Sequence, residues 1–171
     1  MNLFQLIDAG DKDALCGALS DDPDLAGQRS AEGLSPVLHA LYTGNGVHVD
    51  PILDANPPLD VFDAAAVGRT RGLEELLEGE PALATAWSLD GFTALHLAAF
   101  FGQEDAAELL LDRGADPRVA SRHREIKVAP VQSAAAGGHD AIVRLLLDRG
   151  ASLDDLESEE LRNRYAGERG T

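Results

Sequence analysis

The chain has 171 residues, of which 44% are hydrophobic and 26% charged, a balance that excludes wholesale disorder and suffices for one domain with a sizeable core. The 30 acidic and 14 basic residues give a net charge of −16, which disfavours a nucleic-acid partner because a phosphate backbone would be repelled. The sequence contains no run of about 18 apolar residues and begins without a basic, apolar signal segment. We therefore expect no membrane partner and a cytoplasmic location, with which the single cysteine is compatible.

The amino-terminal half of the chain is similar to its middle. Residues 4–54 carry apolar residues, glycines and a proline at positions that recur 58 residues later. The duplication divides the chain near residue 59, just after Asn56-Pro57-Pro58, which must end any helix. Because Gly44-Asn45-Gly46 and Pro51 lie where a second helix is expected, that helix is predicted to be shortened.

The clearest motif occupies residues 90–116. It begins Asp90-Gly91-Phe92-Thr93-Ala94-Leu95-His96-Leu97-Ala98-Ala99 and ends Leu109-Leu110-Leu111-Asp112-Arg113-Gly114-Ala115-Asp116, and a second copy follows 36 residues later. This order of turn, first helix, glycine break, leucine-rich second helix and Gly-Ala end resembles the ankyrin repeat, with Ala94 in place of the usual proline. The resemblance implies an all-α fold, an ankyrin-repeat solenoid of stacked helix-turn-helix units with short hairpin-like turns.

The repeat boundaries follow from these matches. We expect one ankyrin-repeat domain over residues 1–171, with a degenerate second repeat. Its parts are units of about 1–32, 33–59, 60–89, 90–122 and 123–154, followed by a C-terminal cap and tail over 155–171. Acidic residues at the start of that last segment and Arg162 and Arg164 near its end favour a short capping helix, since they complement the helix dipole.

His96 is the residue that most suggests catalysis. In the ankyrin motif this histidine is structural, however, because it bonds the turn and links adjacent repeats, while Thr93 caps the first helix. The sequence shows no nucleophile elbow, no phosphate-binding glycine loop and no spacing typical of metal ligands. We therefore expect no catalytic residue, no metal, no cofactor and no enzymatic activity.

The resemblance also implies where a partner binds. Turn tips and the exposed sides of the first helices form a concave face in ankyrin proteins. The corresponding positions of the fourth unit are Trp87, Leu89, Asp90, Phe92, Phe100 and Phe101, and Tyr42 of the second unit matches Phe100. Half of the chain's 8 aromatic residues fall on this one surface, which is typical of a binding patch. The alternative is that some of these rings, Phe100 above all, insert into the core between repeats.

A basic segment interrupts the acidic chain. Residues 118–127 contain Arg118, Arg122, His123, Arg124 and Lys127. We expect Arg122, His123 and Arg124 to bind a partner that carries carboxylates or phosphates next to apolar groups. The competing interpretation is a solvated loop that neutralises acidic residues of its own chain.

These features favour a monomeric, non-enzymatic interaction module that binds a protein or peptide through an aromatic patch beside a basic loop. A small-molecule binder or an unusual enzyme that uses the same concave surface is the alternative, and a closed pocket over Trp87 and Phe100 would favour it. A third and weaker hypothesis is an acidic inhibitor of a basic protein.

Overall fold

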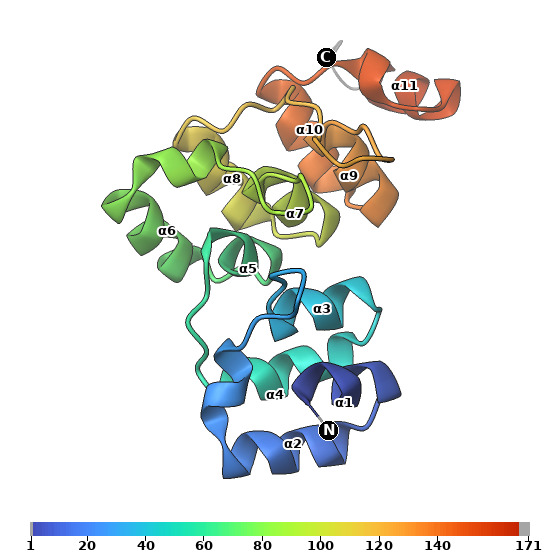
Figure 1. The fold of residues 1–171 in the computed structure, drawn as a ribbon. Coiled ribbons are helices and arrows are strands. Elements are labelled where there is room, and N and C mark those ends of the chain that lie inside the picture. Colours follow the sequence, from blue (N-terminus) through green and yellow to red (C-terminus); the bar gives the residue numbers. More distant parts are fainter. Residues whose placement is uncertain (1, 168–171) are drawn as a thin grey trace. The chain divides into compact units, whose positions relative to one another are not determined.

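A computed structural model of the chain describes residues 2–167, and these form eleven α-helices and four short 3-10 helices (Figure 1). The predicted all-α class is confirmed. The chain divides into two compact units, Met1–Leu59 and Asp60–Thr171, each of which is described by itself. Within residues 2–167, no helix has the length and apolar character needed to cross a membrane.

The first unit contains two helical pairs. Its elements are α1 (Leu3–Ala9), α2 (Lys12–Asp21), η1 (Pro23–Gly27), α3 (Pro36–Tyr42), η2 (Gly46–His48) and α4 (Val49–Asp54). Helices α1 and α3 pack together, as do α2 and α4. Helix α3 begins where Ser35 Oγ accepts the N–H of Leu38 at 3.0 Å, a typical N-cap. The prediction of a shortened second helix is confirmed, because α4 has six residues and its first part is replaced by the 3-10 turn η2.

The second unit contains three helical pairs and a last helix. Its elements are α5 (Val61–Ala66), α6 (Thr70–Gly79), η3 (Pro81–Thr85), α7 (Ala94–Phe100), α8 (Glu104–Asp112), α9 (Pro130–Gly137), α10 (Asp140–Asp148), η4 (Leu153–Asp155) and α11 (Glu159–Ala166). The first helices of successive pairs, α5, α7 and α9, pack side by side, and α8 packs between α6 and α10 (Figure 1). Each pair thus buries its apolar face against its neighbours.

The duplication seen in the sequence recurs in the helix boundaries. Helix α2, the turn η1 and helix α3 begin and end 58 residues before α6, η3 and α7, respectively. Similar spacing of leucines, glycines and prolines has therefore produced the same local structure twice.

The core of the second unit combines small and large side chains. Ala65 of α5 and Ala98 of α7 are fully buried, and small residues let the first helices approach closely. Leu73, Leu110 and Leu146 of the second helices, also fully buried, supply the larger side chains. A substitution such as Leu110→Ala is therefore expected to cost about 2–5 kcal/mol of stability.

The last helix is fixed to the end of the helical stack. Tyr165 of α11 is only 2% exposed, and its hydroxyl donates to Asp140 Oδ1 of α10 at 2.6 Å. Arg164 pairs with the same carboxylate, and Arg162 donates to the carbonyl of Leu156 at 2.7 Å. The predicted cap thus forms a helix over Glu159–Ala166, while residues 168–171 of the predicted tail lie outside the described part of the chain.

Candidate functional site

The turn that precedes α7 has the form of a small hairpin. Trp87 and Thr93 form an antiparallel bridge, and the N–H of Ser88 donates to the carbonyl of Phe92 at 2.8 Å. The Ser88 hydroxyl donates to Asp90 and also accepts the N–H of Phe92 at 3.0 Å, which closes the turn. Leu89 is the outermost of these side chains and is 86% exposed, so the turn presents a large apolar group to solvent.

The connection between α8 and α9 folds back on this turn. The N–H of Ser121 donates to the carbonyl of Val128 at 2.8 Å, which closes a loop over residues 121–128. At the base of the loop, the N–H of Arg122 donates to the carbonyl of Gly91 at 2.7 Å. Gly91 has a φ of +87°, and a Cβ at this position would lie 2.5 Å from the backbone nitrogen of His123. Glycine is therefore required for the loop to dock on the turn.

The docked loop joins the predicted aromatic and basic residues. The guanidinium carbon of Arg122 lies 4.2 Å from the centroid of the Trp87 ring, within cation–π distance. The His123 ring stacks on Phe92 with 5.4 Å between centroids and 24° between planes. Two segments that are distant in the sequence thus form one surface. We call it the turn–loop surface and define it as Trp87–Phe92 together with residues 121–128.

Inside the turn–loop surface, His96 has a structural role, as predicted. It is 1% exposed, and its Nδ1 accepts from both the N–H and the hydroxyl of Thr93, at 3.2 and 2.8 Å. Its Nε2–H donates to the carbonyl of Val128 in the following repeat at 2.9 Å. Burial lowers the pKa of His96 below its usual value, so the neutral ring is favoured. In the next repeat Gln132 reproduces one of these bonds. Its Oε1 accepts the N–H of Ala129 at 2.7 Å, as His96 Nδ1 accepts the N–H of Thr93.

Phe100 and Phe101 lie at the opposite end of α7 from the turn. Their rings meet edge to face with centroids 5.1 Å apart. Phe100 is 44% exposed, so the alternative that it inserts into the core is wrong, whereas Phe101 is half-buried. The backbone here is held by His139, whose Nε2–H donates to the carbonyl of Phe100 at 3.0 Å. The predicted patch therefore consists of two ring clusters at the two ends of one helix. Tyr42, at the end of α3, belongs to the other unit and is 41% exposed.

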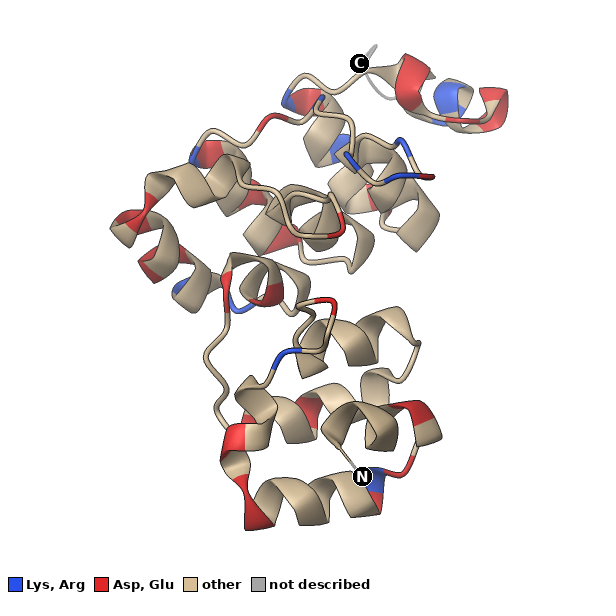
Figure 2. Cartoon of the chain, viewed as in Figure 1, with Lys and Arg blue, Asp and Glu red and all other residues tan. Residues whose placement is uncertain are grey.

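The basic residues of the loop have no acidic partners among residues 2–167. The salt bridges of the second unit instead involve other arginines, as in the pairs of Arg113 with Glu74 and of Arg149 with Asp112, at 3.0 and 2.7 Å. Arg118, Arg124 and Lys127 make no such pair with any described residue, and the guanidinium of Arg122 lies over the Trp87 ring. Figure 2 shows these blue positions along the connection between α8 and α9, whereas red positions recur along α6 and α8. This disfavours the interpretation that the loop neutralises its own chain.

Ile126 is a candidate residue that the sequence interpretation missed. It is 47% exposed in the loop, where its N–H donates to His123 Nδ1 at 3.2 Å and its carbonyl accepts from Ser121 Oγ at 2.5 Å. The sequence did contain a signal for this residue, namely a single isoleucine between Glu125 and Lys127. A large apolar residue inside a charged loop is not expected to lie in the core, so its exposure could have been predicted.

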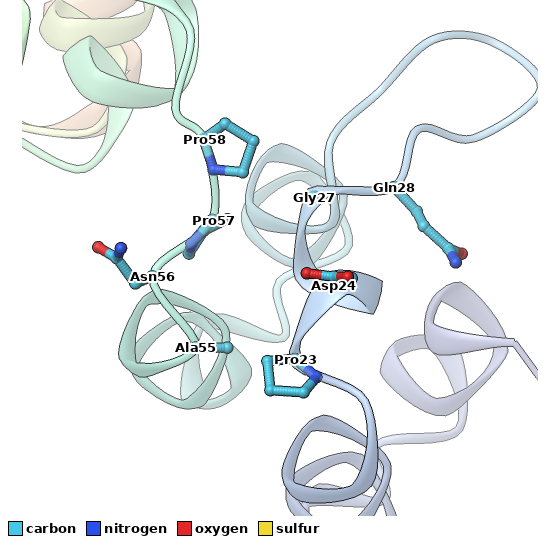
Figure 3. Close-up of a pocket in the computed structure, with 8 residues that line it drawn as sticks. All are labelled: Pro23, Asp24, Gly27, Gln28, Ala55, Asn56, Pro57 and Pro58. Atoms are coloured by element: carbon cyan, nitrogen blue, oxygen red, sulfur yellow. The ribbon is translucent and has the colours of Figure 1, made fainter.

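A surface pocket occurs elsewhere, in the first unit. It has a volume of about 310 Å³ and contains none of the predicted site residues (Figure 3). Its lining is Pro23, Asp24, Gly27, Gln28, Ala55, Asn56, Pro57 and Pro58. Residues 2–167 bring no three His, Cys, Asp or Glu side chains together in a group that could hold a metal ion.

Comparison with known proteins agrees with the repeats. A family model described as ankyrin repeats (3 copies) matches residues 3–121 and 61–157. A probable E3 ubiquitin-protein ligase of Oryza sativa subsp. japonica is 39% identical over 104 residues, which are 60% of this chain and 23% of that protein. A second E3 ubiquitin-protein ligase of the same organism is 37% identical over 89 residues, or 51% of this chain and 19% of the relative. The human ankyrin repeat and KH domain-containing protein 1 is 39% identical over 62 residues, which cover 36% of this chain and 2% of that protein. The chain thus matches less than a quarter of the length of each of these relatives.

Proposed function

Because the chain belongs to the ankyrin repeat family, whose repeats are in general protein–protein interaction modules, we propose that it is a non-enzymatic module that binds a partner protein or peptide through the turn–loop surface and the exposed end of α7. The proposed contact residues of the second unit are Trp87, Leu89, Asp90, Phe92, Phe100, Phe101, Arg122, His123 and Arg124, to which Ile126 is added. We do not propose ligase activity for this chain, since the segments that it matches cover at most 23% of the length of the rice relatives.

The observation that carries this proposal is the distribution of exposed apolar side chains. In the described part of the second unit, the large apolar residues with high exposure are Leu89, Phe100 and Ile126. All three belong to the turn, to α7 or to the loop, and none belongs to α6, α8 or α10. Exposed apolar groups that occur on the turn, first helix and loop, and not on the charged second helices, are typical of a binding surface.

The bonding of His96 argues against an enzyme at the same place. Both of its ring nitrogens are occupied by partners of its own chain, and the ring is almost fully buried. A general acid or base needs a ring nitrogen within reach of the substrate. The carboxylate of Asp90 likewise accepts a hydrogen bond from the hydroxyl of Ser88 in its own turn. These contacts favour recognition over proton transfer.

The experiment that tests the proposal uses the most exposed residues, because their loss costs little stability. A tagged full-length chain is incubated with native lysate, and retained proteins are identified by mass spectrometry for the wild type and for a Leu89→Ser, Phe100→Ser double variant. Val47→Ser removes an exposed apolar side chain of the first unit, 65% exposed, and serves as the control. All three chains should have the same circular-dichroism spectrum.

A protein retained by the wild type and the control but lost from the double variant is the expected result. A partner that is retained equally by the double variant would exclude this surface as its binding site. If the folded wild type retains no specific protein, the small-molecule alternative is favoured, and a metabolite thermal-shift screen is the appropriate next measurement.

A further inference from the structure

Building on the proposed function, we infer that the segment bound at the turn–loop surface is an acidic peptide in which carboxylate side chains flank a large apolar side chain. Both halves of this description come from the chemistry of the surface. The loop supplies basic groups that have no acidic partner in the described part of the chain, and the turn and loop supply exposed apolar groups.

The charge of the surface is reversed with respect to the molecule. Residues 117–128 contain four arginine and lysine residues and one acidic residue, in a chain of net charge −16. Elsewhere in the second unit arginines face carboxylates, as Arg149 does with Glu108 and Asp112. The loop cations lack such partners within residues 2–167 and are therefore available to carboxylates of another molecule.

The position of Arg122 favours a carboxylate in particular. Its backbone is fixed by the bond to Gly91, and its guanidinium is held over the Trp87 ring at 4.2 Å. The ring thus restricts the position of the guanidinium, whose N–H groups form a planar fork that matches a carboxylate. A planar group held in this way loses less side-chain entropy when it binds a carboxylate through two parallel hydrogen bonds.

Apolar groups lie next to these cations. Leu89 is at the tip of the turn and Ile126 is in the docked loop, and both are largely exposed. A polyanion without apolar groups would leave these side chains uncovered. The loop cations and the exposed apolar side chains together favour a peptide that carries both carboxylates and a large apolar side chain over a nucleic acid or an anionic membrane.

Selection from a library tests this inference without knowledge of the partner. A library of random 12-residue peptides displayed on phage is selected on the full-length wild type and on the Leu89→Ser, Phe100→Ser variant. Peptides enriched by the wild type alone should carry net negative charge and at least one Leu, Ile or aromatic residue. Enrichment of neutral or basic peptides would overturn the inference and leave the proposed function standing, whereas no enrichment that depends on these two residues would contradict both.

A charge variant then tests the basic residues. The enriched peptide is titrated against the wild type and against Arg122→Gln, Arg124→Gln, Lys127→Gln, with Lys12→Gln, Arg69→Gln, Arg71→Gln as a control of equal charge change. Trp87, the single tryptophan, reports binding by its fluorescence in all three chains. We expect Kd to rise at least tenfold in the loop variant and to stay within twofold in the control. An equal rise in both variants would show a general charge effect and refute the inference, as would tighter, loop-dependent binding to phosphatidylserine vesicles than to the peptide.

Discussion

His96 offers the most direct test of how the repeats hold together. Replacing it with alanine leaves the N–H of Thr93 without its partner and removes one of the two donors to the carbonyl of Val128, which still accepts the N–H of Ser121. It also opens a cavity where a ring that is 1% exposed had been. An unpaired buried group costs about 1–3 kcal/mol, so with the lost bond to Val128 and the cavity we expect a total loss of about 3–5 kcal/mol. Glutamine is the matched control, because Gln132 accepts the equivalent N–H in the next repeat. His96→Gln should therefore cost only about 1–2 kcal/mol, mainly through the lost bond to Val128.

The assay is urea unfolding of the full chain, followed by circular dichroism at several pH values. Because burial lowers the pKa of His96 below the ordinary value of 6.5, the folded state favours the neutral ring. Its contribution to the free energy of unfolding is then complete above pH 6.5 and is lost as the pH falls below that value. The difference in stability between the wild type and His96→Gln should shrink as the solution is acidified through this range. A loss below about 1 kcal/mol for His96→Ala, or a difference that does not depend on pH, would refute the structural role.

Three further predictions concern other parts of the second unit. Gly91→Val should release the loop from the turn, because its Cβ would collide with the backbone of His123, and the fluorescence of the chain should shift while its helix content stays unchanged. Arg149→Ala should change stability by less than about 1 kcal/mol in thermal unfolding, since its partners are half exposed to solvent. The hydroxyl of Tyr165 lowers the pKa of Asp140 below 3.8, so an NMR titration should show this pKa rising toward 3.8 in Tyr165→Phe. The contribution of Asp140 to stability is present above pH 3.8 and is lost as the pH falls through its folded-state pKa, and an unchanged titration in the variant would contradict this assignment.

The helical architecture was predictable because local signals and packing agree. The helix start at Thr93 and the Gly-Ala end at Gly114 mark one repeat, and the copy 36 residues later marks the next. The first unit lacks the full motif, yet its helices follow the same positions with a shift of 58 residues. Boundaries could be inferred there because the leucines, glycines and prolines are placed alike. The 3-10 start of its last helix depended on Gly46 and Pro51, which were also visible in the sequence.

Many residues of the turn–loop surface could be predicted from the sequence, but the contacts between its turn and its loop could not. The resemblance pointed to Trp87 and Phe92, and the charge pattern pointed to Arg122 and His123. That the loop donates a backbone hydrogen bond to Gly91, and thereby places Arg122 over Trp87 and His123 against Phe92, depends on a contact between segments that share no sequence pattern. Ile126 was missed for the same reason, because its exposure follows from the fold of the loop.

The separation of core and surface residues explains how one repeat can serve both stability and recognition. The core between α5 and α10 uses alanines and leucines that repeat from helix to helix, so its packing does not require the rings of phenylalanine or tryptophan. The rings of Trp87 and Phe92 instead contact the docked loop, and Leu89 beside them is exposed. In the proposed interaction, substitutions at the turn and loop should therefore change the partner at little cost in folding, while the loss of a buried leucine destabilises the stack whichever partner is bound. The binding specificity that we propose accordingly depends on residues that the helical core does not need.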